Sequence, residues 1–171
     1  MRRTLALAAA LVIVGVSTVG ATTLIRMDLD DLARDANLIV VGTVVDVEGR
    51  WDDSLTFVHS DVTLQIEQSL RGNAPAELVL RTPGGQIGGI AQRAEGAATF
   101  EPGERVLVFL TTWDDGAYKV LGYTQGKSRL IAEADGRERL RGGVVEGRTL
   151  DGVVRELHHG VDHNIPLRRV D

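Results

Sequence analysis

Residues 58–71 show the clearest periodicity in the chain, and this pattern constrains the fold more than any other feature. The apolar side chains of the segment share one parity: Val58, Val62, Leu64, Ile66 and Leu70. Polar side chains occupy the other parity: His59, Asp61, Thr63, Gln65, Glu67, Ser69 and Arg71. Since successive side chains of a strand point to opposite faces, the segment predicts a long strand with one buried face and one wet face.

Other apolar runs predict further strands. The run 38–47 is too rich in β-branched residues for a strand with one exposed face, and Gly42 within it predicts a bulge or bend. Asp-Gly pairs at 115–116 and 135–136 predict tight hairpins, the second of them an extra hairpin after Leu130. Shorter strands are expected at 78–80, 106–110 and 118–121.

Two segments have helical spacing. Asp28 is a capping residue for a predicted helix within 27–36, and Thr149 is a candidate cap for a second helix, which Gly152 weakens. The apolar stripe of the first helix is Leu29, Leu32, Ala33 and Ala36, and that of the second is Leu150, Val153, Val154 and Leu157.

Residues 84–103 have no period and contain six glycines. We expect a long irregular loop there, and such loops are often functional. The order of the elements predicts a mainly β fold: a five-stranded OB-like Greek-key barrel with short N-terminal and C-terminal helices and an extra hairpin. Residues 22–171 would form a single domain, with 137–171 as a C-terminal extension.

Residues 1–21 read as a signal peptide. A basic start is followed by an apolar run, and Ala21 is a suitable cleavage site, which would make Thr22 the new N-terminus. The alternative is a retained N-terminal anchor, but Ser17 and Thr18 interrupt the run before the length of about 20 residues that a membrane span requires. We therefore expect a secreted or periplasmic protein without a stable membrane span after cleavage.

The charge and the cysteine content exclude some classes of function. The net charge is −5, and because residues 1–21 contain two arginines and no acid, the remainder carries 17 basic and 24 acidic side chains, a net charge of −7. Such a body repels phosphate backbones, so we expect no nucleic-acid partner. The chain has no cysteine, which excludes thiol catalysis, and an exported bacterial protein fits this absence better than a disulfide-rich animal module.

Four segments carry a resemblance to a known family. Residues 36–45, 62–72, 78–83 and 103–109 together resemble the netrin-like OB-fold domain, and the closest pattern is that of the tissue inhibitors of metalloproteinases. The chain also looks like a set of uncharacterised exported bacterial proteins that share three short elements: Pro83-Gly84-Gly85, Pro102-Gly103-Glu104 and Gln125-Gly126-Lys127.

The resemblance implies a binding function. Members of this family inhibit proteases by chelating the catalytic zinc with the amine and carbonyl of an N-terminal cysteine, whereas this chain would present Thr22, without the cysteine or its disulfides. The family's binding ridge matches two stretches here, 50–54 and 84–89. Its candidate contacts are Trp51, Asp52, Asp53, Gly84, Gly85, Gln86 and Ile87.

Two tryptophans are further candidates for a partner contact. Trp51 and Trp113 both lie at predicted hairpin tips, and aromatic side chains are enriched in interfaces. We therefore expect an exported non-catalytic binding module with a protein partner, such as a secreted metalloprotease, and no cofactor. The oligomeric state stays open.

The C-terminal histidines support an alternative function. His158, His159 and His163 could hold a metal ion, which would make the protein a metal-binding protein or a metal-dependent hydrolase. A solvated C-terminal tail explains them more simply. A third interpretation is a structural, envelope-associated protein.

Overall fold

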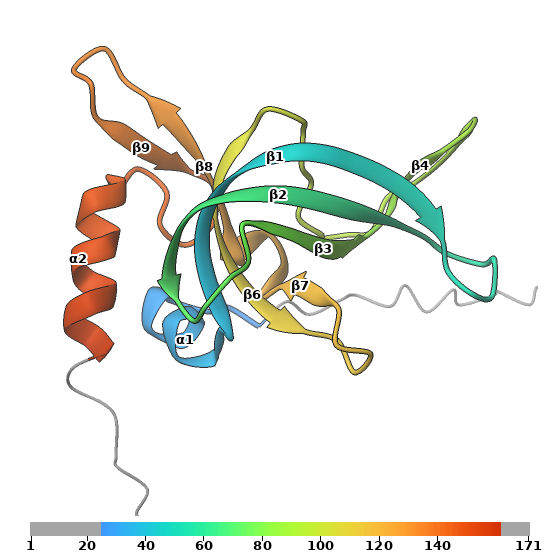
Figure 1. The fold of residues 1–171 in the computed structure, drawn as a ribbon, viewed down its shortest axis with the longest axis horizontal. Coiled ribbons are helices and arrows are strands. Elements are labelled where there is room, and N and C mark those ends of the chain that lie inside the picture. The colour runs from blue at the N-terminus through green and yellow to red at the C-terminus, as the bar shows by residue number, and fades with distance from the viewer. Residues whose placement is uncertain (1–24, 162–171) are drawn as a thin grey trace, which may run out of the picture.

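The computed structural model describes residues 25–161 and has a mainly β architecture (Figure 1). The predicted signal peptide, Thr22 and His163 lie outside the described residues. The elements in chain order are α1 (Leu29–Asp35), β1 (Leu38–Trp51), β2 (Val58–Arg71), β3 (Glu77–Pro83), β4 (Gly85–Ile87), β5 (Ile90–Gln92), β6 (Arg105–Thr112), β7 (Tyr118–Val120), the 3-10 helix η1 (Tyr123–Gly126), β8 (Lys127–Ala132), β9 (Glu138–Arg141) and α2 (Leu150–Val161).

The main sheet curls into a ring. Its strand order is β1-β2-β3-β7-β6-β8-β9, and β1 also pairs with β6, so the sheet returns to its first strand. All pairings are antiparallel except that of β3 with β7, which is parallel and consists of the single pair Leu80 and Tyr118. Strands β8 and β9 extend beyond the ring as a hairpin (Figure 1).

The long alternating strand and its neighbour confirm two predictions. β1 and β2 pair side by side along their length, and the buried positions of β2 begin with Val58, Ser60, Val62 and Leu64. Register shifts interrupt the ladder, one of them between Val41 and Gly42, where a bulge was predicted. A side chain at Gly42 would place Cβ only 2.6 Å from the carbonyl oxygen of Gln65, so glycine permits the close approach of the two strands.

The continuous apolar run at the start of β1 has a simple cause, because both faces of the strand are buried. Leu38 and Val40 face the inside of the ring, whereas Ile39 and Val41 face the two helices. The ring core comprises Leu38, Val40, Val44, Val62, Leu64, Leu78, Leu80, Ala98, Phe100, Val106, Val108 and Leu110. The helix-side core comprises Leu29, Leu32, Ala36, Ile39, Val41, Leu107, Phe109, Leu130, Leu140, Val145, Val153 and Leu157.

Both predicted helices form, and both contribute to the helix-side core. Asp28 caps α1 in a capping box: the amide of Asp31 donates to Asp28 Oδ1 at 2.9 Å, and the Asp31 carboxylate accepts from the Asp28 amide. Thr149 caps α2, since the amide of Gly152 donates to Thr149 Oγ1 at 3.3 Å. The helix continues through Gly160 to Val161.

The prediction of an irregular loop over 84–103 is wrong in its first half. Residues 85–92 form the two-stranded β4–β5 hairpin, in which Ile87 pairs with Ile90 across the turn. Its strands are short and contain few large apolar side chains, so they leave no visible period in the sequence. The second half contributes Ala98 and Phe100 to the ring core.

No helix within residues 25–161 is long and apolar enough to cross a lipid bilayer.

Candidate partner-binding surface

The loop between β1 and β2 is held by one carboxylate. Asp52 accepts hydrogen bonds from Ser54 Oγ at 2.5 Å, from the Thr56 amide at 2.7 Å and from the Phe57 amide at 2.8 Å. These bonds, the one from Ser54 first and that from Phe57 second, lower the pKa of Asp52 to about 2. Asp52 was predicted to contact a partner, but its carboxylate is used within its own loop. Asp53 beside it is exposed.

The same loop presents two large apolar side chains to solvent. Leu55 is 73% exposed and Phe57 is 66% exposed, and they lie three and five residues after Asp52. Leu55 also has a positive φ of 55°. Neither residue was among the predicted contacts, although an apolar residue on each side of Thr56 in an otherwise polar turn was a visible signal. We call residues 52–57 the β1–β2 tip.

The β4–β5 hairpin packs against the base of this tip. The amide of Gly84 donates to the carbonyl of Val58 at 2.9 Å, and Ser60 Oγ donates to the carbonyl of Gly84 at 2.9 Å. On β1, Gly49 lies so close to β4 that a Cβ there would be 1.9 Å from the Gln86 carbonyl oxygen. The structure therefore brings together the two predicted stretches, 50–54 and 84–89, on neighbouring hairpins.

Gln92 connects the two hairpins by its side chain. Its Nε2 donates to the carbonyl of Thr56 at 3.3 Å, and its Oε1 accepts from the amide of Val58. These two backbone groups flank Phe57. Ile90 lies two residues before Gln92 on β5, so its side chain shares that face of the hairpin, and it is 50% exposed. Both hairpins leave the sheet at the same end of the molecule (Figure 1).

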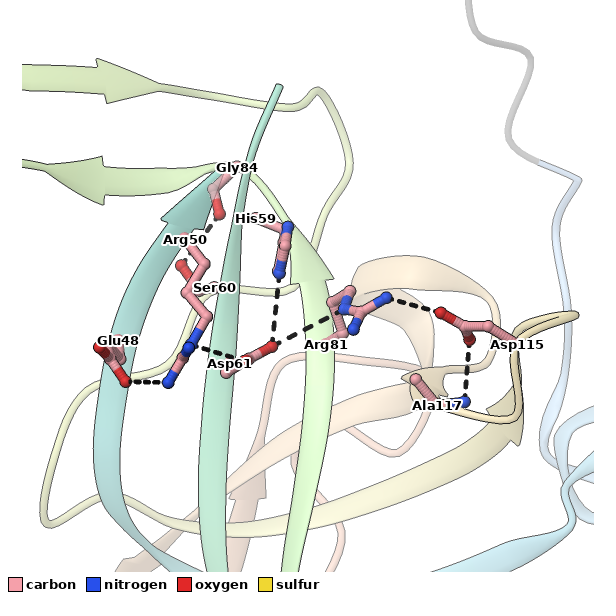
Figure 2. A network of polar contacts seen from close by, with 9 residues as sticks. All are labelled: Glu48, Arg50, His59, Ser60, Asp61, Arg81, Gly84, Asp115 and Ala117. Carbon is pink, nitrogen blue, oxygen red and sulfur yellow. Dashed lines mark hydrogen bonds and ion pairs between the residues drawn. The ribbon is translucent and has the colours of Figure 1, made fainter. Parts of the chain in front are cut away.

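A polar network covers the outer face of β1, β2 and β3 beside these hairpins (Figure 2). At its centre Asp61 lies 3.0 Å from Arg50 Nε, 3.6 Å from His59 Nε2 and 3.7 Å from Arg81 Nε. Arg50 also pairs with Glu48 at 2.7 Å. Every cation of the network thus has an acidic neighbour, and the face as a whole is close to neutral.

The network continues to the β6–β7 hairpin. Arg81 Nη1 donates to Asp115 Oδ2 at 2.8 Å, and Asp115 Oδ1 accepts from the Ala117 amide at 3.0 Å (Figure 2). The Ala117 amide and then Arg81 lower the pKa of Asp115. One chain of polar contacts therefore joins strands β1 and β2, on either side of the tip, to the hairpin that carries Trp113.

The two predicted tryptophans lie at these hairpins but are not fully exposed. Trp51 is the last residue of β1, opposite Val58, and it is half-buried. Trp113 directly follows β6 and is also half-buried, with Lys119 Nζ 3.9 Å from the centre of its ring. The indole nitrogen of Trp113 is buried and has no hydrogen-bond partner among residues 25–161. Trp51 therefore adjoins the β1–β2 tip, whereas Trp113 lies on the separate β6–β7 hairpin.

The histidines lie elsewhere. His158 and His159 are exposed in the last turn of α2, whereas His163 lies outside the described residues. Across the part of the chain that the structure describes, no three histidine, aspartate or glutamate side chains gather in a potential metal site. His59 belongs to the Asp61 network instead.

Comparison with known proteins finds no match: no family model fits the chain, and no curated protein is similar to it at a significant level.

Proposed function

We propose that this protein is an exported, non-catalytic binding module whose hairpin tips contact a protein partner. The observation that carries the proposal is the pair of exposed apolar side chains, Leu55 and Phe57, on a loop that Asp52 holds in one shape. A fixed loop loses little conformational entropy on binding, and its apolar side chains gain by leaving water. Ile90 on the neighbouring β4–β5 hairpin is a further exposed apolar side chain.

We propose an OB-like barrel as the scaffold for this function. The supporting pairings run β1-β2-β3-β7-β6 and back to β1, with the β3–β7 pair parallel. The β1–β2 and β6–β7 hairpins then supply loops of the barrel, and OB-folds bind their ligands in part through such loops.

The proposal includes export. Cleavage after Ala21 would release a protein that begins at Thr22, in the periplasm or the medium. Mass spectrometry of the native protein tests the cleavage. A native protein that still begins at residue 1 would contradict it.

A secreted metalloprotease is the partner class that the family resemblance suggests. In that case the amine of Thr22 would chelate the protease zinc, so one residue added before Thr22 should weaken inhibition. If the protein that begins at Thr22 and the extended protein inhibit a metalloprotease equally, chelation by the Thr22 amine is rejected. The proposal of a contact through the hairpin tips would still stand.

Capture of partners from the native culture medium tests the proposal itself. Mature wild-type protein and three variants, Phe57→Ser, Trp51→Ala and Trp113→Ala, would be immobilised and the captured proteins quantified. Val79→Ser is the matched control, since Val79 is 49% exposed but lies on β3, away from the tips. We expect Phe57→Ser to lose the captured protein and Val79→Ser to retain it. Equal capture by all forms would refute binding through the tips.

A further inference from the structure

The β1–β2 tip departs from a rule that two other hairpins, β6–β7 and β8–β9, follow. In three hairpins the fourth residue of the turn donates its amide to the carbonyl of the first: Leu55 to Asp52, Gly116 to Trp113 and Gly136 to Glu133. In all three the donor residue has a positive φ, which is 55° at Leu55, 84° at Gly116 and 77° at Gly136.

Glycine adopts this conformation freely, whereas a side chain with a Cβ is strained in it. The chain uses glycine at two of the three equivalent positions but a leucine at the third. Leu55 is moreover 73% exposed, so it gains little from burial within the fold to offset this strain. The strain is therefore not offset within the fold, and a strained residue without such an offset points to a role in a complex.

The charges around Leu55 define what the partner must present. Residues 52–57 contain two carboxylates, Asp52 and Asp53, and no basic side chain. Neither carboxylate forms an ion pair within residues 25–161. The nearest arginine along the chain, Arg50, is already paired with Glu48 at 2.7 Å and with Asp61 at 3.0 Å. The tip is thus an apolar knob with an acidic rim.

We infer that Leu55 is the central contact of the tip and that it inserts into an apolar pocket of a protein partner whose rim is basic. This inference rests on the proposed function and deepens it, because it names the anchoring residue and the chemistry of the partner. Interfaces commonly combine a buried apolar anchor with complementary charges around it.

Site-specific photocrosslinking tests this inference. A benzoylphenylalanine replaces Phe57 in the mature protein, or Val79 in the control, and each form is irradiated in the native culture medium. Unlabelled competitors are then added: wild type, Leu55→Gly, Asp53→Asn and Tyr123→Gly. Tyr123 is the matched control because it also has a positive φ, of 59°, but lies in η1, which contacts β6, β7 and β8.

We expect a protein adduct at position 57 that is absent at position 79. Wild type and Tyr123→Gly should compete equally, whereas Leu55→Gly should compete at least about tenfold less well, as expected for the loss of an interface anchor. Asp53→Asn should compete less well at low salt only, because salt screens the rim charges. The adduct peptide should lie beside lysine or arginine residues.

Other outcomes separate the two proposals. If the adduct forms but Leu55→Gly competes as well as wild type, or if the attachment site is acidic, this inference is overturned and the proposed function stands. An adduct with lipid or with a second copy of this chain also overturns it. If no adduct forms at position 57 and no protein is captured, the proposed function itself fails.

Discussion

Lys127 and Glu104 form an ion pair in the interior, with Lys127 Nζ 2.7 Å from Glu104 Oε1 and side-chain exposures of 14% and 4%. The ammonium also donates to the Thr99 carbonyl and lies 4.6 Å from the centre of the Phe100 ring. The amide of Glu101 donates to the second carboxylate oxygen at 3.1 Å. The pair therefore ties β8 to the loop that precedes β6, and few of its hydrogen-bonding groups are left unused.

Removing one partner of this pair should destabilise the fold strongly. Glu104→Gln leaves a nearly buried ammonium without its carboxylate, which costs about 3–5 kcal/mol for such pairs. Urea denaturation measures the effect, and Arg129→Gln is the control, because Arg129 is exposed and lies 3.8 Å from the same carboxylate. The double variant Glu104→Gln with Lys127→Met should lose less than the sum of the single changes, and strict additivity would contradict the pairing.

The shape of the β1–β2 tip should depend on pH only under strongly acidic conditions. Asp52 has an ordinary pKa of 3.8 that the fold lowers to about 2. A lowered pKa means that the carboxylate stabilises the fold above 3.8, and that this contribution is lost as the pH falls from there through about 2. The amide shifts of Ser54 and Phe57 in NMR spectra should therefore stay constant down to about pH 4. A transition of these shifts centred near 3.8 would contradict the role of Asp52.

The pairing of β3 with β7, which closes the ring, should depend on the side chain of Asp115. The two strands share a single residue pair, so few backbone contacts hold them together. The contact of Arg81 with Asp115 adds a side-chain interaction between β3 and the β6–β7 hairpin at this position. Asp115→Ala should accelerate amide exchange in β7 several-fold, while overall stability changes little because the ion pair is exposed.

Asp135→Ala is the matched control for this measurement. Asp135 caps its own turn in the same way, since its Oδ1 accepts from the Arg137 amide at 3.0 Å, but its hairpin does not close the ring. Equal acceleration of β7 exchange in both variants would show that Arg81 and Asp115 have no special role there.

Relief of backbone strain should stabilise the protein at two positions. Leu55→Gly and Tyr123→Gly each remove a side chain from a left-handed conformation, at 55° and 59°. Removing the strain should raise the free energy of unfolding by about 1 kcal/mol in each variant. The greater conformational entropy of glycine in the unfolded chain offsets part of this gain. Urea denaturation of the two variants checks this, and a clear loss of stability in Leu55→Gly would mean that the leucine is needed for the fold.

The sequence was most informative where a pattern depends on neighbours along the chain. The alternation in β2, the capping box of Asp28 and the Asp-Gly turns were all predicted, because each is decided within a few residues. The run beginning at Leu38 was predicted to be buried on both faces. Which of its side chains belong to which core could not be predicted, because that depends on where β6 and the helices lie.

The candidate surface was harder to predict because it depends on contacts between distant segments. The β4–β5 hairpin is fixed by Gly49 and by Gln92, and neither residue has a distinctive local pattern. Asp52 was predicted to contact a partner, but its hydrogen bonds to its own loop were not predicted, and Leu55 and Phe57 were not among the predicted contacts. They became candidates because of their exposure, which a single sequence does not reveal.

The most direct measurement is isothermal titration of the captured partner with purified mature protein. The account predicts that Phe57→Ser raises Kd at least about 30-fold, as for an interface hot spot, whereas Val79→Ser leaves Kd within about twofold of wild type. If Phe57→Ser binds with the wild-type Kd, the hairpin tips are not the binding surface.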